Sequence, residues 1–533
     1  MLQKISSGIS YPDWAKSCRR WKTLDIYDRL LAGTFYDHLQ HAFYDEVEGR
    51  GDSDRLIPID ERRPSAQYKL PRRIAQVMAR KLFAGRHAPK IRHENDDARK
   101  KIENLCRSVK MYQNMLETAL IGSVGSAFVS FRLDEDGTPA LSRWHARDCW
   151  PAFADSGELQ SVRLAYVISG SKWIQLGASV EDADEQYWFV RDWTADGETT
   201  YMPIQKDDWN PVDGFSDDRD SFVEWQRFDH GFGFVPGHWF VNLPGGTNPD
   251  GACTWGDAIP NSIEIDYLLS QTSRGVRYNC APELVIKGDI SNMSSDGLVR
   301  GPTSVLMLEP DKKDGDGNVL GGADAKLLEM TGKGTETALK FVDYLRNMAL
   351  EQCGLSRKDP EKIKGPMSGR AMEFMEEDTA DVVSELRSQY GEFGMLPLLR
   401  KLCAVVLPDV DTTSLNLQWP RLYQPTPQDI AQLVPAFAQA LNPLGVTVQE
   451  KADGSGATMP PEDYQLLTPE EARGYLKLNL DMSMIDIDND DDMQVVENAS
   501  GRPKDSTESN SANNAPIPDD EIESDSGNVR IDV

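Results

Sequence analysis

The fold is decided by residues 255–288, WGDAIPNSIEIDYLLSQTSRGVRYNCAPELVIKG, which run from a long helix into a strand. Asp257 can cap a helix expected over Asp257–Asn279, and Pro260 is tolerated in its first turn. The run Glu283–Lys287 has the apolar, β-branched composition of a strand. A second helix is expected over Thr335–Gln352, so two long helices bracket a small insertion that contains strands.

The helix expected over Thr335–Gln352 is apolar on two faces. One stripe consists of Leu339, Val342, Leu345 and Ala349, and the other consists of Phe341, Tyr344 and Met348. A helix that is apolar on more than one side needs neighbours on more than one side. In a monomer this pattern describes a core helix. In a ring of identical subunits it describes a helix with contacts on both sides, and the sequence leaves both possibilities open.

The residues upstream of this region divide into a helical part and a β-rich part. Apolar residues at helical spacing predict helices near Trp14–Leu31, Ser65–Phe83 and Ala98–Gly122. Short alternating runs between residues 126 and 242 predict the strands Ala127–Leu133, Val162–Ile168, Tyr187–Trp193 and Phe222–Phe228. The pairs Asp136-Gly137 and Asp196-Gly197 suit tight hairpin turns. Together with the helix pair, these elements predict an α+β fold.

Downstream of residue 280 we expect the chain to alternate between loops and helices. A second strand is expected at Ser304–Leu308, and a lysine-containing loop at Lys358–Gly369. A long helix over Arg370–Val406 should be interrupted near Gly391, Gly394 and Pro397. Two further helices are expected at Gln428–Leu441 and Pro469–Leu478. The last stretch, Asp486–Val533, holds 14 acidic and 3 basic residues and is expected to be a disordered tail.

Composition limits the function. The 533 residues carry a formal charge of −29, so the chain should not coat DNA non-specifically. Residues 62–110 are an exception, with 15 Lys and Arg against 4 Asp and Glu. We interpret this basic segment either as solvated helix faces or as a surface that docks an acidic face of a neighbouring subunit or another acidic partner. The seven scattered cysteines indicate reduced thiols. We expect no signal peptide, no membrane span and assembly in a cytoplasm.

No motif carries a convincing catalytic, cofactor or metal site. The histidines His38, His41 and His145 are interpreted as structural, because no partnered nucleophile or ligand cluster accompanies them. We therefore predict that the chain is not an enzyme. The alternative is a cytoplasmic hydrolase that uses paired carboxylates, with Glu373, Glu376 and Glu377 as candidates on one helix face.

Four stretches, taken in order, resemble the portal (head–tail connector) proteins of tailed bacteriophages. They are LPRRIAQVMARKLFAGRHAPKI at 70–91, LETALIGSVGSAFVSF at 116–131 leading to Trp150-Pro151, FVPGHWFVNLPGG at 234–246 with the helix and strand of 255–288, and EQCGLS and MSGRAMEFMEED within 351–399. The resemblance covers about Trp14 to Leu480. It implies a subunit with wing, stem, clip and crown, in a ring that is typically twelvefold.

The resemblance divides the chain into eight parts. These would be a wing at 1–254 with a β-rich part at 126–242, stem helices at 255–279 and 335–352 around a clip at 280–334, a tunnel loop at 353–369, a long kinked helix and wing return at 370–427, a crown at 428–485 and the acidic tail at 486–533. The tail is not explained by the family pattern.

The resemblance also implies location and partners. The ring would sit at the capsid vertex of a virion, pass double-stranded DNA without reading its sequence, and dock the terminase large subunit, a tail adaptor protein, and a major capsid or scaffolding protein. Candidate DNA-channel residues are Lys358, Lys362 and Lys364 in the loop, and Arg274, Arg277 and Lys340 on the helices. Another oligomeric virion structural protein remains the alternative of the same class.

Overall fold

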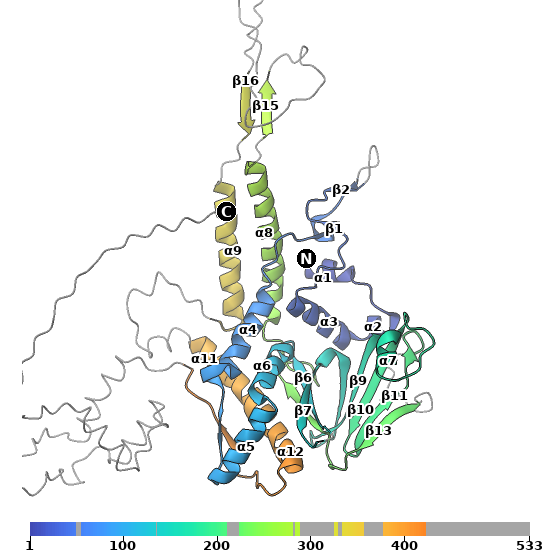
Figure 1. The fold of residues 1–533 in the computed structure, drawn as a ribbon. Helices are drawn as coiled ribbons and strands as arrows, with labels where there is room; N and C mark the ends of the chain where they lie inside the picture. The colour runs from blue at the N-terminus through green and yellow to red at the C-terminus, as the bar shows by residue number, and fades with distance from the viewer. Residues whose placement is uncertain are drawn as a thin grey trace, which may run out of the picture. The chain divides into compact units, whose positions relative to one another are not determined.

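The computed structural model describes residues 1–48, 55–134, 136–209, 223–280, 283–287, 324–328, 333–355 and 377–422. They lie in one of the chain's two compact units, Met1–Thr426, whereas the other unit, Pro427–Val533, falls outside the described residues. The unit contains helices and mostly antiparallel sheets, and most of its strands lie together between residues 126 and 241, which agrees with the expected α+β class (Figure 1).

The N-terminal part is helical, with more breaks than the sequence suggested. Its helices are α1 (Leu2–Ser7), α2 (Asp13–Ser17), α3 (Arg19–Ala32), α4 (Leu70–Phe83), α5 (Asp96–Ser108) and α6 (Met111–Gly122). The single helix expected near Trp14–Leu31 is wrong, because Cys18 is extended and separates α2 from α3. The single helix expected over Ala98–Gly122 is also wrong, because Lys110 adopts a left-handed φ of 49°. The helix expected from Ser65 begins at Leu70, where Pro71 suits a first turn.

Short strands connect the N-terminal helices. They are β1 (His41–Ala42), β2 (Val47–Glu48), β3 (Arg55–Leu56), β4 (Arg62–Arg63) and β5 (Lys90–Arg92). Strand β2 pairs with β3 and β1 pairs with β4. We call residues 36–68, which contain β1 to β4, the N-terminal arm.

The β-rich part that the alternating pattern predicted is present, and its strands form two sheets. The six-stranded sheet contains β8 (Cys149–Phe153), β9 (Leu159–Ser169), β10 (Gln186–Thr194), β11 (Gly197–Tyr201), β12 (Ile204–Gln205) and β13 (Glu224–Asp229), in the order β13-β11-β10-β9-β8 with β12 beside β10. The three-stranded sheet contains β14 (Gly237–Val241), β6 (Ser126–Leu133) and β7 (Pro139–His145), in that order. Both predicted hairpins are confirmed, since β6 pairs with β7 and β10 pairs with β11. A short helix, α7 (Gly170–Gln175), follows β9.

The two predicted long helices are α8 (Ile259–Cys280) and α9 (Lys333–Gln352), which pack side by side. Asp257 does not cap α8 as expected, because residues 256–258 form a 3₁₀ turn and the α-helix begins at Ile259. Strand β15 (Glu283–Lys287) follows α8 and has the predicted bounds. Its partner is β16 (Asp324–Leu328), directly before α9. The strand expected at Ser304–Leu308 lies outside the described residues.

The last described elements are α11 (Glu377–Arg387), the π-helical segment η6 (Ser388–Met395), α12 (Leu396–Val406) and β17 (Asn416–Gln418). The interruption expected near Gly391 and Gly394 is confirmed as η6. Both glycines pack tightly, since a Cβ on Gly391 would meet the Trp419 ring and one on Gly394 would meet the Phe240 ring. The segments expected at Lys358–Gly369, Arg370–Glu376, Gln428–Leu441, Pro469–Leu478 and Asp486–Val533 lie outside the described residues.

Candidate functional surface on the α8–α9 helix pair

One face of α8 is fixed to the N-terminal arm by polar contacts. The Asp266 carboxylate accepts a hydrogen bond from the Tyr36 hydroxyl at 3.0 Å and another from the Tyr68 backbone N–H at 2.6 Å. One turn later, the Ser270 Oγ accepts from the Ala66 N–H at 3.0 Å. The Tyr267 hydroxyl donates to the Arg62 carbonyl oxygen at 2.9 Å. This face of α8 is therefore held in one position by buried and half-buried polar groups from the first 70 residues.

The Asp266 carboxyl is almost fully buried, with 4% of the residue exposed. Burial raises its pKa from 3.8 to about 6, because desolvation outweighs the two hydrogen bonds that favour the charged form. Asp266 is thus a carboxyl held in an environment that disfavours its charge.

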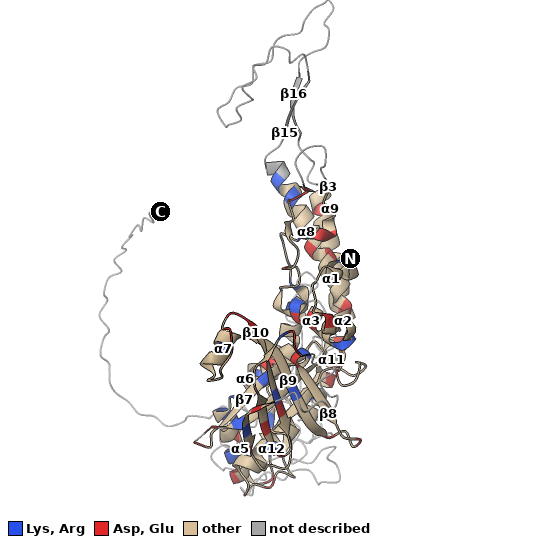
Figure 2. Ribbon diagram, turned by 90° about the vertical axis from the view of Figure 1, so that its right-hand side faces the viewer, with Lys and Arg blue, Asp and Glu red and all other residues tan. Residues whose placement is uncertain are grey.

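The far end of the same α8 face carries two arginines that the sequence offered as DNA-channel candidates. Arg274 forms an ion pair with Glu46 and is one quarter exposed. The Arg277 guanidinium lies 4.7 Å from the centre of the Tyr44 ring. Both side chains therefore contact the N-terminal arm within the same subunit. Figure 2 shows basic residues, in blue, toward the end of α8 that leads to β15.

Helix α9 contacts a different face of α8. The Asn261 amide donates to the Gln352 side chain at 3.0 Å, and Asn261 lies about 140° around the α8 axis from Asp266. The α9 residues Val342, Leu345 and Ala349 are buried, at 9%, 6% and 0% exposed. Helix α8 therefore lies between the N-terminal arm on one side and α9 on another.

The second apolar stripe of α9 is largely exposed. Phe341 is 46% exposed and Tyr344 is 62% exposed, and their rings stack with centroids 6.4 Å apart. Leu339, on another flank, is 46% exposed. Exposed large apolar side chains that cluster on one element mark interaction surfaces. The two-faced pattern of the sequence thus resolves into one face that packs on α8 and one flank, Phe341 and Tyr344, that no described residue covers fully.

Lys340, the third helix candidate for DNA contact, forms an exposed ion pair with Glu336 at 2.7 Å. Its ion-pair partner Glu336 is also on α9, whereas Arg274 and Arg277 lie on α8 and contact the N-terminal arm. Lys358, Lys362 and Lys364 lie outside the described residues.

The carboxylates of the alternative hydrolase hypothesis are not assembled into a site that can be described. Glu373 and Glu376 lie outside the described residues, and Glu377 is exposed at the first turn of α11. Among the described residues, no group of three or more His, Cys, Asp or Glu side chains is placed to hold a metal ion. Within the same ranges, every helix is too short or too polar to span a bilayer.

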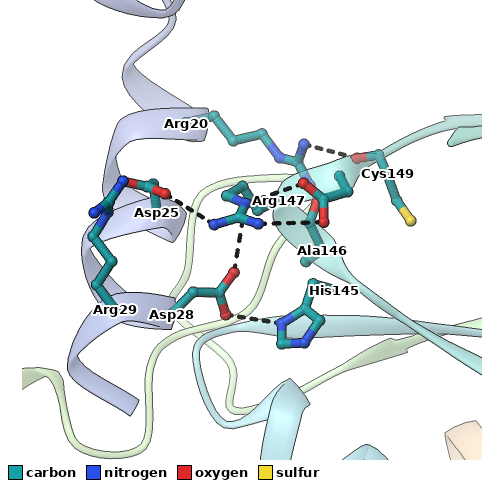
Figure 3. A network of polar contacts seen from close by, with 9 residues as sticks. Arg20, Asp25, Asp28, Arg29, His145, Ala146, Arg147 and Cys149 are labelled. Atoms are coloured by element: carbon teal, nitrogen blue, oxygen red, sulfur yellow. Dashed lines mark hydrogen bonds and ion pairs between the residues drawn. The ribbon is translucent and has the colours of Figure 1, made fainter. Parts of the chain in front are cut away.

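The described chain does contain one dense polar cluster, which joins α3 to the loop between β7 and β8 (Figure 3). Arg147 donates to Asp25 at 2.9 Å and to Asp148 at 3.0 Å, and lies 3.8 Å from Asp28. His145 contacts Asp28 at 3.0 Å. The hydrogen bond to Asp28 raises the pKa of His145, and desolvation raises the pKa of Asp148 against the effect of Arg147.

The contacts of this cluster indicate a structural role, because arginine side chains on both sides of it pair with carboxylates. Arg29 pairs with Asp25 at 2.6 Å, and Arg20 pairs with Asp250 at 2.6 Å while donating to the Cys149 carbonyl oxygen at 2.9 Å. The interpretation of His145 as structural is consistent with these contacts. His38, interpreted in the same way, contacts the Ile5 carbonyl oxygen at 2.9 Å.

Sequence reasoning did not find the cluster, since Asp25 and Arg147 are 122 positions apart. A local signal was present, however. Asp25 and Asp28 lie on a helix beside Leu24, Leu30 and Leu31, and acidic residues on the buried side of an amphipathic helix predict basic partners elsewhere.

Comparison with known proteins gives matches among solved structures only. No protein-family model matches the chain, and no curated protein matches it. One similar chain comes from the virion of a native gene transfer agent (GTA) particle, with 12% identity and a TM-score of 0.33 over 84% of this chain and 95% of that chain. Another comes from the neck of an empty GTA particle computed with C6 symmetry, with 13% identity and a TM-score of 0.33 over 84% and 95%. A third comes from the neck of a native GTA particle computed with C12 symmetry, with 13% identity and a TM-score of 0.33 over 77% and 89%. TM-scores this low do not establish a shared fold.

Proposed function

We propose that the chain is a portal subunit, a non-enzymatic virion structural protein that assembles into a ring around a DNA channel. The observation that carries the proposal is the α8–α9 pair. Its two helices flank the insertion that contains the β15–β16 pair, and the flank of α9 formed by Phe341 and Tyr344 is exposed. This arrangement is what the resemblance to portal proteins implies for the stem and clip.

The physics of the pair suits a ring better than a monomer. In a monomer, two neighbouring aromatic side chains about half exposed to water are unfavourable, since burial of apolar surface contributes about 25 cal/mol per Å². In a ring, the same flank meets a neighbouring subunit and its apolar area leaves water. The arm on the other side of α8 keeps that helix fixed while α9 is presented outward.

The charge of the chain fits a conduit for DNA. A subunit with a net charge of −29, repeated around a channel, repels the phosphate backbone and disfavours tight binding. Contacts to DNA would then come from a few local basic side chains without sequence specificity. Lys358, Lys362 and Lys364 remain the proposed loop contacts. Arg274, Arg277 and Lys340 are proposed as weaker contacts, since each already has an intrachain partner.

The proposed partners follow from this role. They are further copies of the chain, in a ring that we expect to be twelvefold, the terminase large subunit and later a tail adaptor at the β15–β16 end, and a capsid or scaffolding protein. Assembly would take place in the host cytoplasm. The motor, and not this chain, would hydrolyse ATP.

The test is direct imaging of purified full-length chain by negative-stain electron microscopy, with native mass measurement on the same sample. Rings with a central hole and about twelve subunits, the number that the family resemblance implies, are the expected result. Replacing both Phe341 and Tyr344 by serine should reduce ring formation, whereas Lys340→Ser on the same helix serves as the matched control. Monomers that persist at high concentration would refute the proposal. Closed rings without a channel would favour a different virion structural protein.

A further inference from the structure

Helix α4 exposes one narrow strip of its surface, and every charged residue in that strip is basic. Its apolar residues Leu70, Ile74, Met78 and Leu82 are at most 2% exposed. The remaining face carries Arg72, Arg73 and Arg80, and Lys69 directly precedes the helix. We call these four residues the basic strip, and all four are exposed. The three arginines make no ion pair with any residue that the structure describes.

Helix α11 exposes a strip of the opposite charge. Thr379, Val383 and Leu386 are buried at about 1% exposed. The exposed face carries Glu377, Asp378, Asp381 and Glu385, which we call the acidic strip. These residues share one face because they are spaced at one, three and four positions along a helix. None of them forms an ion pair with a described residue.

The two strips are opposite in charge and similar in length. At a rise of about 1.5 Å per residue, the basic strip spans about 16 Å and the acidic strip about 12 Å along their helices. Like charges at such spacings repel within one helix. Helices α4 and α11 pack on each other within one subunit. Among the described residues, however, neither the three arginines nor the acidic strip has an ion-pair partner, so each strip could supply what the other lacks.

We propose that the basic strip of one subunit docks on the acidic strip of the next. This inference rests on the proposed ring and goes beyond it by naming the pair of surfaces. Two different complementary patches make a head-to-tail interface, which closes into a ring when the rotation allows. A second copy of the chain is favoured over duplex DNA as the occupant. DNA would satisfy only the basic strip and would leave the acidic strip unmatched.

The experiment exchanges the charges of the two strips. One variant combines R72E, R73E and R80E, a second combines E377K, D381K and E385K, and a third carries all six changes. The ring fraction of each full-length chain is measured by native mass measurement in low salt and in 1 M salt. The matched control combines K100E, K101E and R107E on α5, which changes the net charge as much as the first variant at exposed positions.

Each three-residue reversal should lower the ring fraction at least about tenfold, because like charges then face each other. The six-residue variant should recover assembly, and an equimolar mixture of the two three-residue variants should form mixed rings. The α5 control should assemble like the wild type. Salt at 1 M, where the Debye length falls to about 3 Å, should weaken the wild-type interface.

The failures of the two proposals are distinguishable. Wild-type chain that never forms rings overturns the proposed function and this interface with it. Wild-type rings that tolerate both reversals overturn the interface and leave the function standing. Loss of rings in the basic-strip variant alone, without rescue by the six-residue exchange or by mixing, shows that the basic strip binds another anion and also overturns the pairing.

Discussion

Replacing Asp266 by Asn removes the buried carboxyl that joins α8 to the N-terminal arm without changing its shape. The remaining carbonyl oxygen can still accept from the Tyr68 N–H, as one carboxylate oxygen does now. The new amide can donate to the Tyr36 hydroxyl oxygen, which currently donates to the carboxylate. The variant therefore imitates the protonated form of Asp266 and isolates the effect of its charge.

The size of the effect on stability follows from the pKa of Asp266. Burial raises the pKa of Asp266 from 3.8 to about 6, so the folded chain holds this proton to higher pH than the unfolded chain. The stability that comes from the proton is complete below pH 3.8 and is lost as the pH rises through 6. The full effect is about 3 kcal/mol, since one pKa unit corresponds to about 1.4 kcal/mol. Between pH 5 and pH 7.5 the free energy of unfolding of the wild type should fall by about 1 kcal/mol relative to that of Asp266→Asn.

The assay is urea unfolding of both proteins at pH 5 and pH 7.5, followed by tryptophan fluorescence. Only the difference between the proteins is used, because all other groups titrate in both. Asp343→Asn on α9 is the matched control, since Asp343 is 55% exposed in its ion pair with Arg346. A stability difference that does not change with pH, or that favours the wild type at pH 7.5, would refute the reasoning about Asp266.

Three further predictions concern single positions. Arg147→Met leaves Asp25 and its neighbours without their shared cation and should cost about 3–5 kcal/mol in urea unfolding, with the loss smaller at acidic pH where the carboxylates take up protons. Gly391→Ala drives a methyl group into the Trp419 ring and should lower stability by about 1–3 kcal/mol, with a change in tryptophan emission as an independent readout. Lys110 is exposed and has a left-handed backbone, which glycine adopts without steric cost. Lys110→Gly should therefore raise the free energy of unfolding by on the order of 0.5–1 kcal/mol, measured by thermal melting.

Local patterns in the sequence predicted elements where composition and periodicity agreed. The strand Glu283–Lys287 and the helix ending at Gln352 have their predicted ends, because a dense apolar run and a two-faced stripe leave few alternatives. The predicted helix boundaries were wrong where a single residue leaves the helical conformation. Nothing in the apolar spacing around Cys18 or Lys110 shows the break, since the stripe continues across it.

Long-range pairing was the part that the sequence could not provide. The partner of β15 is β16, and its residues Asp324–Leu328 follow a run of glycine and aspartate that predicts a turn more strongly than a strand. The basic segment was visible as a charge count, but its division into a buried and an exposed side of α4 required the structure. The contacts of Arg274 and Arg277 with the N-terminal arm were likewise hidden, because Glu46 and Tyr44 lie more than 200 positions away.

The attachment of α8 to the N-terminal arm also determines when, during synthesis of the chain, these contacts can form. Tyr36 and Tyr68 leave the ribosome about 200 residues before Asp266 does. At about 5–20 residues per second this interval lasts about 10–40 s. Contacts with such large sequence separation form slowly, because loop closure must precede any gain from them. The nascent arm therefore lacks its α8 partner during this interval, and in the proposed ring a subunit could contact a neighbour only after the middle of the chain has been made.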